Sequence, residues 1–311
     1  MKRLIGFEAA PAGDLRLPVV TVGVFDGVHR GHSHLIYELR RWSHAIGGTA
    51  SVLTFERHPV TLLRGIEIPM ILSVENRLLE LERHGVELAW VIDFGAIREL
   101  SPEAFLSDVL VRRLGCKHLL LGFDSTLGKG RAGTARNLPG IGASLGIEVR
   151  IAPPVFDKEG KKISSTAIRD AIRRGDLEAA ANVLGRPFSI RGPVVRGAGR
   201  GRALGVATAN LDLTGQLVPP DGVYLVRVYA GERTAAAVAN LGVGPTFGEQ
   251  GPRRLEVHVP GWSGDLYGET LEVRLVRRLR EERRFPDAAT LREQIGRDIA
   301  ALAQAVASGE V

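Results

Sequence analysis

Two histidines stand three residues apart in the run His29-Arg30-Gly31-His32, directly after an apolar, Val-rich stretch. If a helix begins there, both imidazoles lie on one face of its first turn and can donate hydrogen bonds to a shared group. The positive end of the helix dipole favours an anion, and glycine lets backbone N–H groups approach a phosphate. The spacing therefore predicts stabilisation of an α-phosphate whose charge grows as pyrophosphate leaves. Surface-loop histidines and metal ligands are the alternatives.

A second, hydroxyl-rich helix start lies in Ile163-Ser164-Ser165-Thr166-Ala167-Ile168-Arg169. Ile168 and Ile172 fall on one helical face, so the serines and Thr166 stand at the beginning of the helix. Hydroxyl and N–H groups there, with Arg169 one turn further on, can bind phosphate oxygens. Simple N-capping is the alternative, because Ser and Thr commonly cap helices.

Three polar residues in the second half suit phosphoryl transfer. Thr208 and Asn210 are two residues apart, so in an extended strand they point to one face. A hydroxyl and an amide oxygen together suit Mg²⁺ that carries ATP phosphates. Glu256 alternates with Leu255 and Val257, which places its carboxylate on the non-core face, where it can act as a general base toward a hydroxyl. Polar groups that only face solvent are the alternative for all three.

A glycine-rich, basic run precedes Thr208. Its glycines can let backbone N–H groups cradle the phosphates of ATP, and the residues we assign to this role are Gly197, Gly199 and Gly205. The run does not match the P-loop pattern that ends in Gly-Lys-Ser/Thr. A mobile basic loop is the alternative.

The elements that must position the first two motifs alternate between strand and helix. Strand-like apolar runs cover residues 18–25, 51–55, 88–94 and 117–122. Between them, Ser73 can cap a helix through about His84, and Ser101-Pro102 can start another that ends near Gly115. This alternation predicts an α/β region with a parallel sheet, which binds ligands at the carboxyl ends of its strands.

The pattern changes after about residue 185. Period-2 alternation with many glycines follows, and Ala230-Gly231-Glu232-Arg233 is typical of a hairpin turn. Several short strands predict a mainly β region, a small antiparallel barrel, which is closed by a helix over about 287–306. We therefore expect two domains, 1–185 and 186–311.

Composition narrows the function classes. The formal net charge is +6, but the basic residues are scattered and aromatics make up 5%, which favours phosphorylated small molecules over nucleic acid. No apolar run approaches the length of a membrane helix, and Glu8 and Asp14 interrupt any signal-peptide pattern. The single cysteine, Cys116, fits a reducing compartment. We expect a cytoplasmic protein with no nucleic-acid or membrane partner, as a monomer or weak oligomer.

Both halves resemble bacterial bifunctional riboflavin kinase/FMN adenylyltransferases. In the first half the resemblance rests on residues 21–32, on Thr54-Phe55-Glu56-Arg57-His58-Pro59 and on 163–169. In the second half it rests on residues 197–205, 208–211, 222–224, 240–247, 255–258 and 265–268. The resemblance implies a Rossmann-like nucleotidyltransferase domain followed by a riboflavin kinase barrel. It also implies that the chain uses ATP with Mg²⁺ to convert riboflavin to FMN, and then FMN to FAD.

Residue roles follow from the same resemblance. His29, His32 and Arg169 would serve adenylyl transfer, and Glu256 would deprotonate the ribityl 5′-hydroxyl, with Thr208 and Asn210 binding Mg–ATP. ATP binding in the first domain would use Gly23, Phe25, Asp124, Ser165 and Thr166.

Two segments depart from the family pattern. Ser125 replaces the aromatic residue that usually follows the position of Asp124, and Ala207 replaces a usual proline before Thr208. The alternatives are therefore a chain that retains one activity, or a flavin-binding regulator without catalysis. The regulator predicts loss of His29, His32, Arg169 or Glu256, and all four are present.

Overall fold

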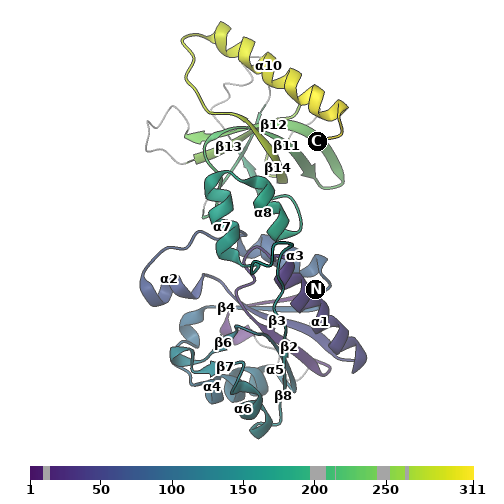
Figure 1. Ribbon diagram of the computed structural model, residues 1–311, viewed down its shortest axis with the longest axis vertical. Helices are drawn as coiled ribbons and strands as arrows, with labels where there is room; N and C mark the ends of the chain where they lie inside the picture. The colour runs from purple at the N-terminus through teal and green to yellow at the C-terminus, as the bar shows by residue number, and fades with distance from the viewer. Residues whose placement is uncertain (10–14, 197–207, 214, 244–252, 263–265) are drawn as a thin grey trace. The chain divides into compact units, whose positions relative to one another are not determined.

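Figure 1 shows the computed structural model, which describes residues 1–311 apart from 10–14, 197–207, 214, 244–252 and 263–265. Contacts between residues divide the chain into two compact units, Met1–Ser165 and Thr166–Val311. The expected domain boundary at residue 185 stays a prediction. Within the described residues, no helix is both long and apolar enough to span a membrane.

The first unit is built on a six-stranded parallel sheet with the order β1-β4-β3-β2-β5-β8, which confirms the predicted parallel sheet. Every residue of β2 and β4 is buried, as expected for parallel strands covered on both faces. The short edge strands β1 and β8 were not predicted, because charged residues interrupt their apolar pattern. The strands are β1 (Lys2–Ile5), β2 (Pro18–Val22), β3 (Thr49–Phe55), β4 (Leu88–Ile92), β5 (His118–Gly122) and β8 (Glu148–Ala152).

Helices follow the strands, as the sequence predicted. Ser73 caps α3 by accepting a hydrogen bond from the Asn76 N–H, and Gly85 follows that helix with φ +80°. The helix predicted from Ser101-Pro102 to Gly115 is present, but its middle, Phe105–Val111, is π-helical, which the sequence pattern does not signal. The helices are α1 (Arg30–Ala45), α2 (Pro59–Arg64), α3 (Val74–Arg83), α4 (Pro102–Ala104), α5 (Arg112–Leu114) and α6 (Leu138–Ser144), with a small hairpin of β6 (Thr126–Leu127) and β7 (Gly133–Thr134) between α5 and α6.

The two faces of the sheet bury different helices. Alternate strand residues, such as Val20, Leu53 and Trp90, form one core cluster with the π-helical segment. Helix α1 contacts β2, β3 and β5, and it buries Leu35, Leu39 and Trp42, which lie on one face at spacings of four and three. The loop between β2 and α1 is therefore fixed at both ends by buried elements.

The second unit contains a closed antiparallel barrel with the order β10-β13-β12-β11-β14-β9, which confirms the predicted barrel. Helix α10 (Ala288–Ala307) begins at the N-cap Asp287, as predicted, and packs Leu302 and Ala305 on Val223 and Leu225. The preceding helices are α7 (Ser165–Arg174) and α8 (Leu177–Leu184). The strands are β9 (Ser189–Val195), β10 (Thr208–Leu211), β11 (Gly222–Ala230), β12 (Arg233–Val243), β13 (Arg253–His258) and β14 (Thr270–Arg280).

Candidate functional site

A pocket of about 300 Å³ lies beyond the carboxyl ends of β2, β5 and β8 in the first unit. From β2 the chain builds the sheet outward through β3 and β4, and from β5 it builds toward β8 on the opposite side. The pocket therefore stands at the topological switch point, where open α/β sheets bind ligands. Its walls include the loop before α1, the segment after β5 and the start of α7. The predicted residues in these walls are Gly23, Phe25, His29, His32, Asp124 and Ser165.

His29 is the N-cap of α1. Its Nδ1 accepts a hydrogen bond from the His32 N–H at 3.2 Å, and its side chain is buried. The imidazole thus replaces the Ser or Asp that usually caps a helix, which fixes the ring at the helix start. Gly31 leaves room for this ring, because a Cβ there would stand 3.2 Å from it, a tight contact that would have to shift the imidazole.

His32 stacks on His29 with ring centroids 3.7 Å apart and planes 12° apart, and Phe25 packs on its other side. Burial, then the neighbouring His29 and Arg77, lower the pKa of His32 well below 6.5. Its Nδ1 is buried and has no hydrogen-bond partner within the described residues. His32 lines the pocket, and a neutral imidazole there can bind an incoming phosphate, whose charge would favour the imidazolium.

The backbone between β2 and α1 adopts conformations that side chains disfavour. Phe25 and Val28 have φ of +52° and +39°, and Gly27 lies between them at +84°. A positive φ is a genuine outlier for a β-branched residue such as Val28. Residues held in such conformations cluster at functional sites.

The start of α7 contacts this loop. Ser165 Oγ donates a hydrogen bond to the Asp26 carbonyl at 2.8 Å, so the hydroxyl that was predicted to bind phosphate also holds the histidine loop. Thr166 and Arg169 follow on the same helix, and Thr166 is exposed while Arg169 is buried. Both belong to the second contact unit, and their phosphate contacts stay predictions.

Asp124 forms an ion pair with Lys162 at 2.5 Å, and Lys162 Nζ lies 4.9 Å from the centroid of the Phe123 ring. All three side chains line the pocket. His58 lines it as well, and its Nδ1 accepts the Val60 N–H at the start of α2. The segment after β5 therefore offers an aromatic face beside Asp124, at Phe123, two positions earlier than in the family pattern.

Sequence analysis missed two buried charged residues beneath the loop. The carboxylate of Asp26 accepts hydrogen bonds from the N–H groups of Ile71 and Leu72. Arg77, fully buried on α3, donates to the carbonyls of Val24 and Phe55. The signal for Arg77 was present, because it stands directly beside Leu78 and four residues before Leu81, on the buried side of a helix.

In the second unit, three polar residues form a row across neighbouring strands. Asn210 of β10 is paired in register with Glu256 of β13, and Glu256 with Asn240 of β12. Directly paired residues share a face, with Cβ atoms about 5 Å apart. The register therefore brings together the predicted metal ligand and the predicted base. Asn240 was not predicted as a site residue.

The side chain of Asn210 is suited to bind a cation. It is 5% exposed, and its Oδ1 has no hydrogen-bond partner within the described residues. A buried amide oxygen without a donor is a suitable ligand for a hard divalent ion. Thr208, two residues earlier on β10, is half-buried on the same face. In the described part of the chain, no group of three or more His, Cys, Asp or Glu residues is arranged to hold a metal.

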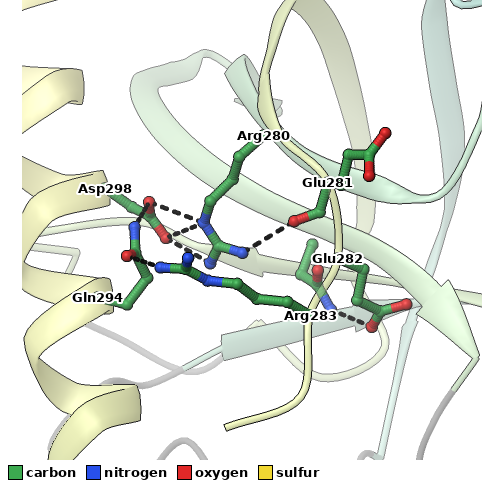
Figure 2. A network of polar contacts seen from close by, with 7 residues as sticks. Arg280, Glu281, Glu282, Arg283, Gln294 and Asp298 are labelled. Carbon is green, nitrogen blue, oxygen red and sulfur yellow. Dashed lines mark hydrogen bonds and ion pairs between the residues drawn. The ribbon is translucent and has the colours of Figure 1, made fainter.

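Figure 2 shows the polar network that joins the segment after β14 to α10 and β12. Arg280 donates to both oxygens of Asp298, the closest at 2.8 Å, and Gln294 bridges Asp298 and Arg283. Asn240 donates to Glu282 at 3.2 Å. The segment that starts at Glu281 is thereby fixed beside the row that contains Glu256.

Three of the predicted phosphate-binding residues, Gly197, Gly199 and Gly205, lie outside the described residues. The same holds for Ala207, the departure from the family pattern. Their phosphate-binding role stays a prediction.

Family models match both halves of the chain. A model for FAD synthetase matches residues 13–167, and a model for riboflavin kinase matches residues 184–306.

Relatives align over nearly the whole length. A bifunctional riboflavin kinase/FMN adenylyltransferase from Pseudomonas fluorescens is 37% identical over 284 residues, which cover 91% of each chain. One from Bacillus subtilis is 34% identical over 287 residues, 90% of each chain. A crystal structure from Streptococcus pneumoniae, described as a macrolide-efflux protein, superposes with a TM-score of 0.82 at 32% identity and covers 97% of this chain and 99% of that one.

Proposed function

The chain belongs to the family of bifunctional riboflavin kinase/FMN adenylyltransferases, and on that premise we propose how its residues make FMN and then FAD. It is a transferase with two activities. The kinase moves the γ-phosphoryl group of ATP to riboflavin and releases ADP. The adenylyltransferase joins the AMP part of ATP to FMN and releases pyrophosphate.

Adenylyl transfer is assigned to the first pocket. A phosphate oxygen of FMN attacks the α-phosphorus of ATP, and the bond to the bridging oxygen of pyrophosphate breaks. His32, a neutral ring in the pocket wall, and His29 at the start of α1 bind the α-phosphate as its negative charge grows. The single observation that carries this assignment is the stacked pair of imidazoles at a helix N-terminus on the switch point of the sheet.

Further residues would bind the rest of the substrates. The ATP-binding residues are assigned as Gly23, Phe25, Asp124, Ser165 and Thr166. Arg169 is assigned to the part of the triphosphate that leaves as pyrophosphate. The presence of Gly23, Phe25, Asp124 and Ser165 in the pocket walls supports the assignment of these four.

Riboflavin phosphorylation is assigned to the barrel. Glu256 accepts the proton of the ribityl 5′-hydroxyl as that oxygen attacks the γ-phosphorus. Thr208 and Asn210 are assigned to the divalent ion, which we take to be Mg²⁺ and which would neutralise phosphate charge. The buried, unpartnered Oδ1 of Asn210 beside Glu256 supports this.

The metal assignment has its own test. Asn210→Ala removes the free amide oxygen, so the Mg²⁺ concentration for half-maximal kinase rate should rise by about tenfold or more, as for the loss of a metal-site partner. Magnesium titrations of riboflavin phosphorylation measure it, with FMN adenylylation as the unaffected reference. An unchanged Mg²⁺ requirement would remove Asn210 from the metal site.

We propose functional domains at 1–185 and 186–311, and a cytoplasmic monomer or weak oligomer without nucleic-acid partners. The end of α8 at Leu184 supports the boundary. The one cysteine, Cys116, is buried, and burial raises the pKa of its thiol to about 12, which suits a reducing compartment without requiring it.

Two separate assays test the proposed function. With riboflavin and ATP, the protein should release ADP and FMN, and with FMN and ATP it should release pyrophosphate and FAD. Loss of only one pair of products would show that one activity is retained. Loss of both, in a protein that still binds flavin, would support a regulator instead.

A further inference from the structure

The loop that presents His29 and His32 is strained and needs anchors. Phe25 and Val28 both have positive φ, and each such non-glycine residue costs about 1–3 kcal/mol unless its surroundings enforce it. Residues 23–28 lie between the end of β2 and the N-cap of α1, where the chain leaves the sheet after the Gly23 N–H donates to the Leu53 carbonyl. The geometry of the two imidazoles therefore depends on side chains that bind this backbone.

Arg77 is the buried cation that reaches this backbone. It is 0% exposed, and Nη1 donates to the Val24 carbonyl at 2.9 Å while Nη2 donates to the Phe55 carbonyl. Val24 follows β2 by two residues, and Phe55 is the last residue of β3. The fork therefore joins the strained loop to the neighbouring strand end.

Two more contacts converge on the same loop. Thr54 Oγ1 donates to the Val24 carbonyl at 3.0 Å, so that oxygen has two side-chain donors. Asp26 binds the backbone N–H groups that precede α3. The loop is thus bound to β3 through Thr54, to the segment before α3 through Asp26, and to α3 itself through Arg77.

A simple packing role does not explain a cation at this position. Burial of a charged group costs several kcal/mol unless its partners compensate, and an apolar residue would fill the buried side of α3 more cheaply. Burial lowers the pKa of Arg77 to about 10, against the opposing effect of Asp26, so the side chain is still protonated at neutral pH. Its Nε has no hydrogen-bond partner within the described residues, so the two terminal nitrogens make the hydrogen bonds that compensate for burial.

We propose that Arg77 is a positioning residue for adenylyl transfer: its fork between the Val24 and Phe55 carbonyls holds the loop that aims His29 and His32 at the transferring phosphate. The inference rests on the proposed function of the first pocket. Arg77 itself contacts no substrate. It acts through the backbone of the loop.

The test compares Arg77→Met with Arg77→Lys, Thr54→Val and the control Arg83→Met. Arg83 is on the same helix, but its side chain is half-exposed and pairs with Glu80 at the surface. The readouts are kcat and KM for FAD formation from FMN, the rate of riboflavin phosphorylation by the same protein, and thermal stability. Thermal stability reports whether the first unit of each variant is folded, and the kinase rate, from the second half of the chain, is the internal reference for active protein.

Arg77→Met should lower kcat for FAD formation by about 100-fold, the effect of a roughly 1 Å misplacement of catalytic groups, with little change in KM for ATP. Arg77→Lys keeps the charge but not the planar fork, so it should recover part of the loss. Thr54→Val, which removes only the second donor to Val24, should give a smaller loss in the same direction. Arg83→Met and all kinase rates should stay at the wild-type level.

An unchanged kcat in Arg77→Met, or a rise in KM with unchanged kcat, would overturn the inference. If Arg77→Met does not fold, Thr54→Val decides, and a wild-type kcat in that variant would count against the anchor.

A readout without activity separates this inference from the proposed function. His29 and Arg77 are the charged or titratable groups that act on His32. Loss of the Arg77 charge should therefore raise the pKa of His32, as measured by NMR titration of the imidazole. If wild type makes no FAD, the proposed function fails, and this titration still tests whether the Arg77 charge acts on His32, as their placement around the loop requires. An unchanged His32 titration in Arg77→Met would contradict the inference.

Discussion

The two halves of the molecule position their reactive groups by different means. In the first unit, His29 and His32 stand at the end of a loop whose backbone has positive φ at two side-chain-bearing residues. Buried Arg77 binds that backbone from α3, and the carboxylate of Asp26, in the loop itself, accepts from backbone N–H groups before α3. In the second unit, Asn210, Glu256 and Asn240 stand on strands, and the register of the barrel alone places them in a row.

This difference has a physical consequence. A strand fixes the direction of each side chain through its period of two, so a polar row needs no dedicated anchor. A loop has no such ladder, and its geometry depends on hydrogen bonds from side chains that must themselves be buried and paired. The adenylyltransferase site should therefore be sensitive to distant substitutions, and the kinase site mainly to changes in the row itself.

The largest effect is expected for a substitution in the polar row of Asn210, Glu256 and Asn240 in the barrel. Glu256→Gln removes the general base, so riboflavin phosphorylation should fall by about 10²–10⁴-fold. FAD formation from supplied FMN should be unchanged. Separate assays of the two steps measure it, and Glu232→Gln, in the exposed hairpin turn, is the control. A kinase rate near wild type would show that Glu256 is a solvated surface residue.

The reciprocal substitution, at His32, affects the activity assigned to the first half of the chain. His32→Ala removes a donor that faces the growing phosphate charge, so FAD formation should fall by about 10²–10³-fold. Riboflavin phosphorylation should stay at the wild-type level, and His44→Ala, exposed in the last turn of the same helix, should leave both steps unchanged. Equal losses in both activities would contradict separate sites.

A third change tests the polar network that joins β14 of the barrel to α10. Asp298→Ala leaves Arg280 and Gln294 without their shared acceptor, so the free energy of unfolding of the second unit should fall by about 1–3 kcal/mol. Glu293→Ala, which removes an exposed pair with Arg297 on the same helix, should change it by less than about 0.5 kcal/mol. Chemical denaturation measures both. A similar effect for the two variants would mean that the network in Figure 2 adds no stability.

The smallest effect concerns pH. The pKa of His32 is lowered in the folded protein, so above about pH 6.5 the ring is neutral in both the folded and the unfolded state. As the pH falls below that value, the unfolded state binds a proton that folded His32 does not, and the free energy of unfolding should decrease. The decrease should be weaker in His32→Ala, as thermal unfolding at pH 7.5, 6.5 and 5.5 measures. Identical pH profiles would show that His32 is not buried as a neutral ring.

Much of the architecture was predictable because local patterns agree with the fold. Ser73, Ser101 and Asp287 cap helices where the sequence placed them, and period-2 alternation gave the strands around Glu256. The parallel sheet, with a pocket at the carboxyl ends of its strands, followed from the alternation of strand and helix. Helix α1 began at Arg30, directly after the capping His29, as the motif required.

Other features depend on contacts that no local pattern encodes. The roles of Asp26 and Arg77 arise between residues about 50 positions apart in sequence, and an arginine within a helix is usually a surface residue. The pairing of Asn240 with Glu256 needs strand register, which sequence periodicity leaves open. The π-helical turn at Phe105–Val111 has no composition signal at all.

The most direct test of the whole account is a time course with riboflavin as the only flavin. The purified protein is incubated with riboflavin, excess ATP and Mg²⁺, and the flavins are separated by chromatography. The account predicts that FMN appears first and that FAD follows at its expense. A folded protein that leaves both riboflavin and supplied FMN unconverted would contradict it.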